Sequence, residues 1–259
     1  MSYLLEFLVF GIKQARAAIF AGSFFVLLFA SNYLPLYGLP RYDFLFLSAV
    51  LLQAILYFTG LETKEEVRTV FIFHLIGLGL EIFKTSPGIG SWSYPEAAFF
   101  KIATVPLFSG FMYAAVGSYI SQSWNVMKLE LKGYSNYTLS AVLGILIYIN
   151  FFTNHYIYDF RLFLIAAIFI LFWKTRVYFT ALHNRRWMPL NVAFVLIAFF
   201  IWIAENVSTY FGAWQYPDQV HQWTLVSSQK ITSWFLMVII SFILVAYLKH
   251  VRRESRRDN

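Results

Sequence analysis

The sequence predicts an all-α integral membrane protein with about eight transmembrane helices, built as two parallel four-helix repeats. Composition is the first reason. Of the 259 residues, 59% are hydrophobic and only 13% are charged, whereas soluble domains carry about 25% charged residues. The second reason is a series of apolar segments that approach the length needed to cross a bilayer. The third is a set of short motifs that occurs twice in the same order.

Composition also excludes several kinds of function. The chain contains no cysteine, which excludes disulfides, thiolate chemistry and cysteine-ligated metals. Its five histidines show none of the spacings typical of metal sites, so we expect neither a metal nor a cofactor. The net charge of +7 is typical of basic cytoplasmic loops. No basic patch stands apart from an apolar segment, so we expect no nucleic-acid partner.

The N-terminal half begins with residues 1–16, which have the amphipathic character of a helix at a membrane interface. The first span, residues 17–31, could be mistaken for a signal peptide. The Asn32-Tyr33 pair that follows it has a counterpart later in the chain, which places this span within a repeat. Three further spans are expected at residues 43–61, 67–85 and 97–122, the last with Pro106 inside it.

The C-terminal half is expected to contain four more spans, at residues 137–152, 160–178, 190–207 and 231–248. Several of the eight are shorter than the ~20 residues that cross a bilayer, so flanking aromatic residues must complete them.

Basic residues predict the orientation of these spans. An even number of spans places both termini on one side of the membrane. Of the 20 Lys and Arg residues, the only ones expected on the opposite side are Arg41, Lys84, Lys101, Arg161 and Lys230. Because basic residues are enriched in cytoplasmic loops, both termini are predicted to be cytoplasmic. The predicted location is the bacterial cytoplasmic (inner) membrane, with membrane lipid as a partner.

Two stretches that close apolar segments share one pattern: E-x-x-x-T, a short gap, then G-x-W-x-Y-P and an acid. The first copy runs from Glu81 to Glu96, and the second runs from Glu205 to Asp218. Similar pairs precede and follow them in the same order. Tyr42-Asp43-Phe44 corresponds to Tyr158-Asp159-Phe160, and Lys101-Ile corresponds to Lys230-Ile.

This order predicts two equivalent four-helix units. The first is residues 1–136, including the amphipathic lead-in, and the second is residues 137–259, including a basic cytoplasmic tail. Because four spans per unit is an even number, the two units should be related by a pseudo-two-fold axis along the membrane normal.

The doubled motif supplies the candidate functional residues. At a rise of about 1.5 Å per residue, Glu81 and Glu205 lie at similar heights in the outer half of the bilayer. Lys101 and Lys230 enter the same layer from the outer side, so each Glu is expected near a Lys. We take Glu81 and Glu205 as catalytic candidates. The substrate-binding candidates are Lys84, Trp92, Tyr94, Glu96, Lys101, Asn206, Thr209, Trp214, Tyr216, Asp218 and Lys230.

Simpler interpretations of the same residues stay open. The Trp-x-Tyr-Pro stretches also fit an interfacial aromatic belt. The Glu and Lys layer also fits a set of contacts that only locks helices together.

The run from Phe73 to Tyr119 resembles an uncharacterised family of bacterial inner-membrane proteins, the DUF817 family. It includes Glu81-Ile-Phe-Lys-Thr, Gly90-Ser-Trp92-Ser-Tyr94-Pro-Glu96 and Thr104-Val-Pro106-Leu-Phe-Ser-Gly110. The resemblance covers nearly the whole chain and implies no activity. Glu81 with Trp92-Ser-Tyr94 is also similar in style to membrane carotenoid-modifying proteins of the lycopene cyclase type. The paired-Glu signature of those cyclases is missing here, since Glu96 and Asp218 are single acids.

Three functions fit these observations. The first is a membrane enzyme that acts on an isoprenoid or lipid, in which Glu81 or Glu205 protonates an alkene and aromatic faces stabilise the cation. The second is a transporter or channel for a small solute. The third is a structural membrane protein. The sequence does not determine the oligomeric state.

Overall fold

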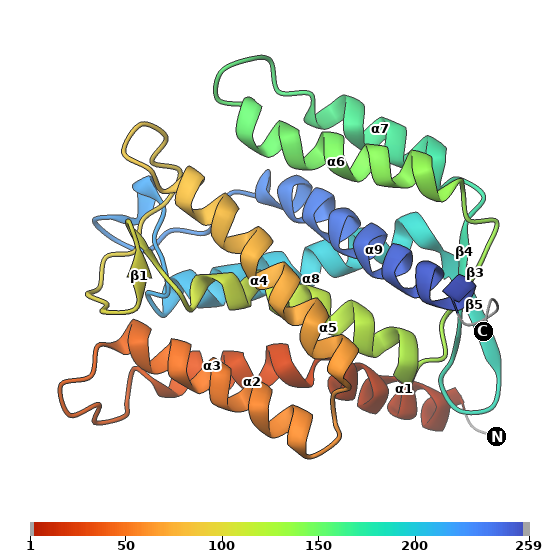
Figure 1. Cartoon of the computed structure of the whole chain (residues 1–259), viewed down its shortest axis with the longest axis horizontal. Helices are drawn as coiled ribbons and strands as arrows, with labels where there is room; N and C mark the ends of the chain where they lie inside the picture. Colours follow the sequence, from red (N-terminus) through yellow and green to blue (C-terminus); the bar gives the residue numbers. More distant parts are fainter. Residues whose placement is uncertain (1–2, 256–259) are drawn as a thin grey trace. The chain divides into compact units, whose positions relative to one another are not determined.

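The computed structural model describes residues 3–255, which are mostly helical (Figure 1). The chain divides into two compact units, each made of segments that are distant in the sequence. The sheet unit comprises Met1–Arg16, Ser123–Ile201 and Ser228–Asn259. The motif unit comprises Ala17–Gln122 and Trp202–Ser227, so it contains both copies of the doubled motif.

In the sheet unit, α6 (Tyr137–Thr153) packs against α7 (Arg161–Leu171) and α9 (Lys230–Ser255) (Figure 1). Asn136 begins α6 by accepting hydrogen bonds from the backbone N–H groups of Thr138 and Leu139 at 2.8 and 3.3 Å, as N-cap residues do. The helices are α1 (Tyr3–Ala17), α6 (Tyr137–Thr153), α7 (Arg161–Leu171), the first part of α8 (Leu190–Tyr210) and α9 (Lys230–Ser255).

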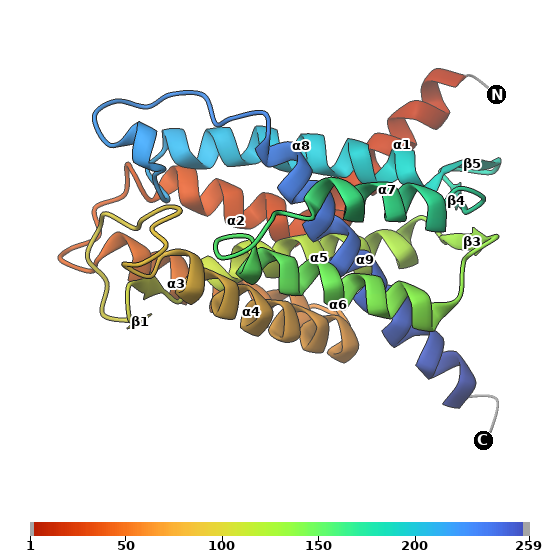
Figure 2. The ribbon, with the colours of Figure 1, turned by 90° about the horizontal axis from the view of Figure 1, so that it is seen from above.

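An antiparallel sheet of three strands, in the order β3-β4-β5, completes this unit. It consists of β3 (Glu130–Lys132), β4 (Arg176–Thr180) and β5 (Arg185–Pro189). The strands lie at the ends of α6, α7 and α8 to which they are connected (Figure 2). Helix α1 packs on the sheet, where the rings of Phe10 and Phe179 are 5.6 Å apart. Arg186 also pairs with Glu6 at 2.7 Å and lowers the pKa of that carboxyl.

In the motif unit, the apolar helices α2 (Ile19–Ala30) and α3 (Arg41–Phe58) pack against each other. Helix α4 begins with a capping box, in which the Thr63 and Glu66 side chains each accept from the other residue's backbone N–H. Its elements are α2 (Ile19–Ala30), α3 (Arg41–Phe58), α4 (Lys64–Lys84), β1 (Lys101–Ile102), β2 (Val105–Pro106), α5 (Ser109–Val126), the end of α8 and the short 3₁₀ helix η1 (Pro217–Gln219).

A helix is present in each of the eight segments that the sequence marks as apolar, and residues 1–16 form the helix α1. Among residues 3–255, three helices are long and apolar enough to cross a membrane: Arg41–Phe58, Leu190–Tyr210 and Lys230–Lys249. The number rises to four if α1 and α2 form one broken span. Eight complete spans and the two-repeat layout therefore stay predictions.

Two predicted segments have different boundaries from those expected. Residues 97–108 are a loop with the β1–β2 hairpin, and α5 starts only at Ser109. Pro106 lies in this hairpin, because proline in a helix interior would remove a hydrogen bond and clash with the preceding turn. In the segment 160–178, the helix ends at Leu171 and β4 begins at Arg176. Here the chain turns to β-branched and aromatic residues that favour a strand.

Helices α4 and α5 approach each other closely at glycines. A Cβ atom added to Gly77 would lie 2.5 Å from Cδ2 and 2.8 Å from Cβ of Tyr113. A Cβ atom on Gly110 would lie 2.6 Å from Nδ1 of His74 and 2.7 Å from its backbone oxygen. Only glycine allows this separation, which brings Tyr113 of α5 next to the C-terminal half of α4.

We expect Gly77→Ala to lower the free energy of unfolding by about 1–3 kcal/mol, the usual cost of overpacking a close contact. The added methyl group meets the Tyr113 side chain near its backbone, where the ring cannot simply rotate away. Thermal unfolding of the detergent-solubilised protein measures the change. Gly22→Ala in α2 is the matched control, because nothing lies within 4 Å of its added Cβ. Equal stability of the two variants would contradict the close crossing.

Candidate functional site

Glu81 of α4 lies in the interior of the motif unit, where its side chain accepts three hydrogen bonds. The residue is 2% exposed. The indole N–H of Trp92 and the hydroxyl of Tyr94 both donate to Oε2 at 2.7 Å, and the hydroxyl of Tyr113 donates to Oε1 at 2.7 Å. A buried carboxylate is costly unless such donors satisfy it. The loop after α4 therefore folds back so that its Trp-x-Tyr stretch reaches the end of that helix.

The second copy repeats this contact. Glu205 is 3% exposed, and its Oε1 accepts a hydrogen bond of 2.6 Å from the hydroxyl of Tyr216. The tyrosine of the Trp-x-Tyr stretch therefore donates to the glutamate of its own copy in both cases. The threonine of this copy, Thr209, accepts from the indole N–H of Trp223 at 3.1 Å.

The two copies also pair directly with each other through their backbones. Ser93 and Gln215, the middle residues of the two Trp-x-Tyr stretches, form an isolated antiparallel bridge. Their N–H and carbonyl groups exchange hydrogen bonds of 2.9 and 3.0 Å. The rings of Trp92 and Tyr216 meet edge to face with centroids 6.2 Å apart. Equivalent positions of the two copies thus face each other.

Aromatic side chains surround the first glutamate. The rings of Tyr42, Tyr94 and Phe108 form a mutual cluster with centroid distances of 4.9–5.9 Å. The ring of Tyr94 is partly exposed, but its hydroxyl is desolvated. This burial, followed by the charge of Glu81, raises the pKa of Tyr94 well above its usual range, and burial with Glu205 does the same for the pKa of Tyr216. Both hydroxyls therefore remain protonated donors.

Arg41 links the two copies, a role that the sequence analysis did not assign. Its side chain, 9% exposed, pairs with Glu96 of the first copy at 2.5 Å. It donates to the backbone oxygen of Phe211, which precedes the second Trp-x-Tyr stretch, at 2.7 Å. It also donates to Ser31 at 2.9 Å. The guanidinium group of arginine carries five N–H donors in a fixed plane, so it can bind several acceptors at once. The only sequence signal was its position beside the repeated Tyr-Asp-Phe element.

Asp43 fixes the start of the β1–β2 hairpin. It is fully buried, and its two oxygens accept from the backbone N–H groups of Phe99 and Phe100 at 2.8 Å each. Two charged residues of one helical turn of α3, Arg41 and Asp43, thus hold both ends of the loop segment 96–100.

Comparison with known proteins identifies a family and one relative. The family described as "Protein of unknown function (DUF817)" matches residues 6–242. The chain belongs to the DUF817 family. It is also 47% identical over 246 residues to "Uncharacterized protein YoaT" of Bacillus subtilis (strain 168), which covers 95% of this chain and 92% of the relative. No solved structure matches. The family resemblance seen in the sequence is therefore confirmed.

The other candidate residues of this DUF817 chain lie in different surroundings. Lys84 and Thr209 are buried in the motif unit, as are Asn206 and Trp214. Asn206 accepts from the backbone N–H of Val226 at 2.8 Å, which positions the loop after η1. Asp218 is exposed at the start of η1.

The two lysines expected beside the glutamates, Lys101 and Lys230, each begin a different element. Lys101 is exposed on β1, because the helix expected there starts later, so it is not buried with Glu81. Lys230 begins α9 and belongs to the sheet unit. The buried ammonium group of the motif unit is that of Lys84, three residues after Glu81 on α4.

One face of α4 is polar along its buried length. Glu66, Thr69, His74, Glu81 and Lys84 are all at most 8% exposed. The ring of His74 packs on Phe111 with centroids 4.4 Å apart. Helix α4 therefore buries Glu66, Glu81 and Lys84 on this face, whereas the charges of Lys64, Glu65 and Arg68 in its first turns are exposed.

Tyr113→Phe should lower the free energy of unfolding by about 1–3 kcal/mol, because Glu81 loses one donor while its carboxylate stays buried. Thermal unfolding in detergent measures this. Tyr37→Phe, at a tyrosine that is 95% exposed, should leave the midpoint unchanged. If both variants behaved like wild type, the hydrogen bond to Glu81 would not contribute to stability.

Arg41→Lys should loosen the pairing of the two copies, because one ammonium group cannot replace contacts to Ser31, Glu96 and Phe211 together. We expect faster hydrogen exchange at the amides of Ser93 and Gln215. Arg185→Lys, in the sheet unit, is the control and should leave those amides protected. Unchanged exchange in Arg41→Lys would contradict the link.

Proposed function

We propose that this DUF817 protein is a multipass enzyme of the bacterial inner membrane, with both termini cytoplasmic, that acts on an isoprenoid or lipid. The site is the doubled motif, and Glu81 and Glu205 carry the chemistry. The observation that carries this proposal is the pairing of Ser93 with Gln215, which places two Glu–Tyr pairs and their tryptophans in one compact unit.

The chemistry that suits such a site is stabilisation of a carbocation. Aromatic faces attract cations, and a nearby carboxylate adds an opposite charge. Both oxygens of Glu81 accept hydrogen bonds, so it is arranged to act as an anion rather than to give a proton. Glu205, whose Oε1 accepts a hydrogen bond from the Tyr216 hydroxyl, is the proposed acid. Its proton would pass to an alkene carbon to form the cation, and loss of a proton from a neighbouring carbon back to Glu205 would complete an isomerisation or cyclisation.

The same pairing supports the internal repeat. Two antiparallel strands that pair at equivalent residues are related by a local two-fold axis, as expected for two copies of one ancestral unit. Each copy also keeps its own glutamate–tyrosine hydrogen bond. These contacts favour the division at residues 136 and 137 as a duplication, although the compact units cut across that boundary.

A second candidate function is the movement of a small solute or proton, favoured by the buried polar face of α4. Polar and charged residues on that face extend from Glu66 through His74 to Lys84. Chains of such residues are typical of relays in transporters.

The variants Glu81→Gln and Glu205→Gln test whether the protein is an enzyme that uses these two carboxylates. The amide keeps the shape of the carboxylate, so the fold should survive while conversion falls by about 100-fold or more. Lipids and isoprenoids extracted from cells that express wild type, each variant or an empty vector are compared by mass spectrometry. Glu65→Gln, at an exposed position on α4, is the control.

Identical lipid profiles in all of these cells, with every variant folded, would rule out the enzyme. Flux of a solute or proton into proteoliposomes that Glu81→Gln abolishes would then favour transport. No effect in either assay would leave a structural role for the buried glutamates.

A further inference from the structure

The outer face of the β3–β4–β5 sheet concentrates basic and aromatic side chains. At the start of β4, Thr175 and Val177 on either side of Arg176 are buried, whereas Lys174 and Arg176 are exposed. The register pairs Lys132 with Arg176 and Tyr178 with Trp187, so these residues share that face. Three cation–π contacts connect them: Arg176 to Trp187 at 4.1 Å, Arg185 to Tyr178 at 4.7 Å and Lys132 to Tyr178 at 5.1 Å.

The positive charge of this face is not balanced by the sheet itself. Its acid, Glu130, pairs with Arg185. Within residues 3–255, neither Lys132, Lys174 nor Arg176 takes part in an ion pair. Lys132 and Arg176 are direct cross-strand neighbours, and like charges in that position destabilise a sheet. An anion above them would remove this repulsion.

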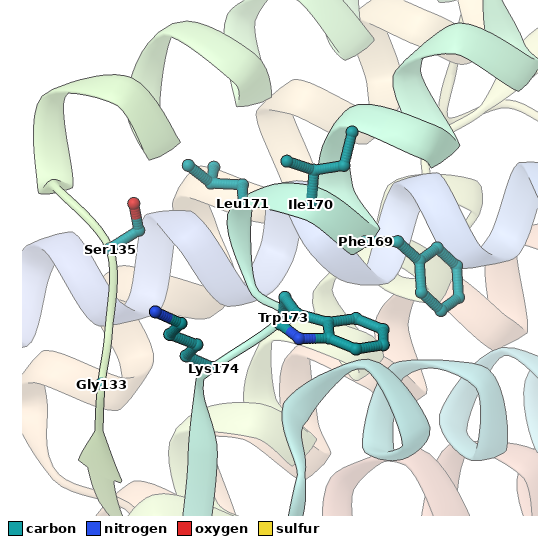
Figure 3. A pocket seen from close by; sticks show the side chains of 7 residues that line it. All are labelled: Gly133, Ser135, Phe169, Ile170, Leu171, Trp173 and Lys174. Carbon is teal, nitrogen blue, oxygen red and sulfur yellow. The ribbon is translucent and has the colours of Figure 1, made fainter.

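A groove continues from the basic face onto helix α7. It has a volume of about 530 Å³ and is lined by Gly133, Ser135, Phe169, Ile170, Leu171, Trp173 and Lys174. Figure 3 shows the nitrogen of Lys174 and the hydroxyl of Ser135 at one side, with the rings of Trp173 and Phe169 at the other. Ile170 and Trp173 are 77% and 76% exposed. The groove is therefore polar at the sheet and apolar along the helix.

Gly133 shapes the polar end of the groove. Its φ is +67°, and a Cβ atom there would lie 2.7 Å from the backbone oxygen of Lys174. Thr175 also donates to the backbone oxygen of Gly133 at 2.9 Å. The segment that carries Lys174, just before β4, is thus held close to the turn before α6.

We propose that this surface binds an anionic phospholipid, with its phosphate at Lys132, Lys174 and Arg176 and an acyl chain along Phe169, Ile170 and Trp173. Charge complementarity and the change from basic to apolar lining favour this ligand over a neutral lipid. The sheet also joins the ends of the apolar helices α6, α7 and α8. In the proposed membrane protein this position would lie at the depth of the lipid headgroups. This site uses none of the residues of the doubled motif.

Native mass spectrometry of the full chain in detergent tests the site, with phosphatidylglycerol and phosphatidylcholine as probes. We expect phosphatidylglycerol to bind more tightly. The triple variant Lys132→Gln, Lys174→Gln, Arg176→Gln should bind phosphatidylglycerol about 100-fold more weakly, because each basic residue contributes about five-fold to the affinity for an anionic lipid. A matched triple variant at exposed cations of the motif unit, Lys64→Gln, Arg68→Gln, Lys101→Gln, should bind like wild type.

A second measurement follows the acyl chain. Phosphatidylglycerol with brominated acyl chains should quench Trp173, so the quenched fraction should fall in Trp173→Phe. Equal binding of the two lipids, equal losses in the two triple variants, or unchanged quenching in Trp173→Phe would overturn the proposal. Displacement of phosphatidylglycerol by millimolar inorganic phosphate would also overturn it, because the site would then recognise a free anion.

Discussion

The cost of burying the Glu81 carboxylate governs the local structure of the motif unit. A buried anion is tolerated only where donors surround it, and three side chains from two segments supply them. Tyr113 comes from a helix that glycines bring close, and Trp92 and Tyr94 come from a loop that must fold back. The conformation of residues 85–108 therefore depends on the hydrogen bonds to the Glu81 carboxylate as much as on the burial of apolar side chains.

Two charged residues in one turn of α3, Arg41 and Asp43, bind that loop. Arg41 donates hydrogen bonds to Glu96 and to the backbone oxygen of Phe211, before the second Trp-x-Tyr stretch. Asp43 accepts hydrogen bonds from the backbone N–H groups of Phe99 and Phe100. The two motif copies then meet through backbone hydrogen bonds at Ser93 and Gln215. Glutamates, tyrosines and tryptophans gather in one place because charged residues outside the motif fix the loops that carry them.

The two compact units separate two kinds of polar surface. The motif unit buries Glu81 and Glu205, which accept hydrogen bonds from aromatic side chains. The sheet unit turns its charges outward, where arginines and lysines rest on the faces of Tyr178 and Trp187. In a chain with few charged residues, both arrangements concentrate charge in small regions.

The sequence alone determined the helices, because long apolar segments such as 43–61 and 190–207 leave few alternatives to a helix. It also determined the family and the existence of two Glu…Trp-x-Tyr copies. Tertiary structure alone decided that Ser93 pairs with Gln215, that Arg41 joins the copies, that Lys101 is exposed on a hairpin, and that residues 130–132, 176–180 and 185–189 form a sheet. Backbone hydrogen bonds between distant segments use atoms that every residue carries, so no pattern of side chains along one chain records which segments will pair.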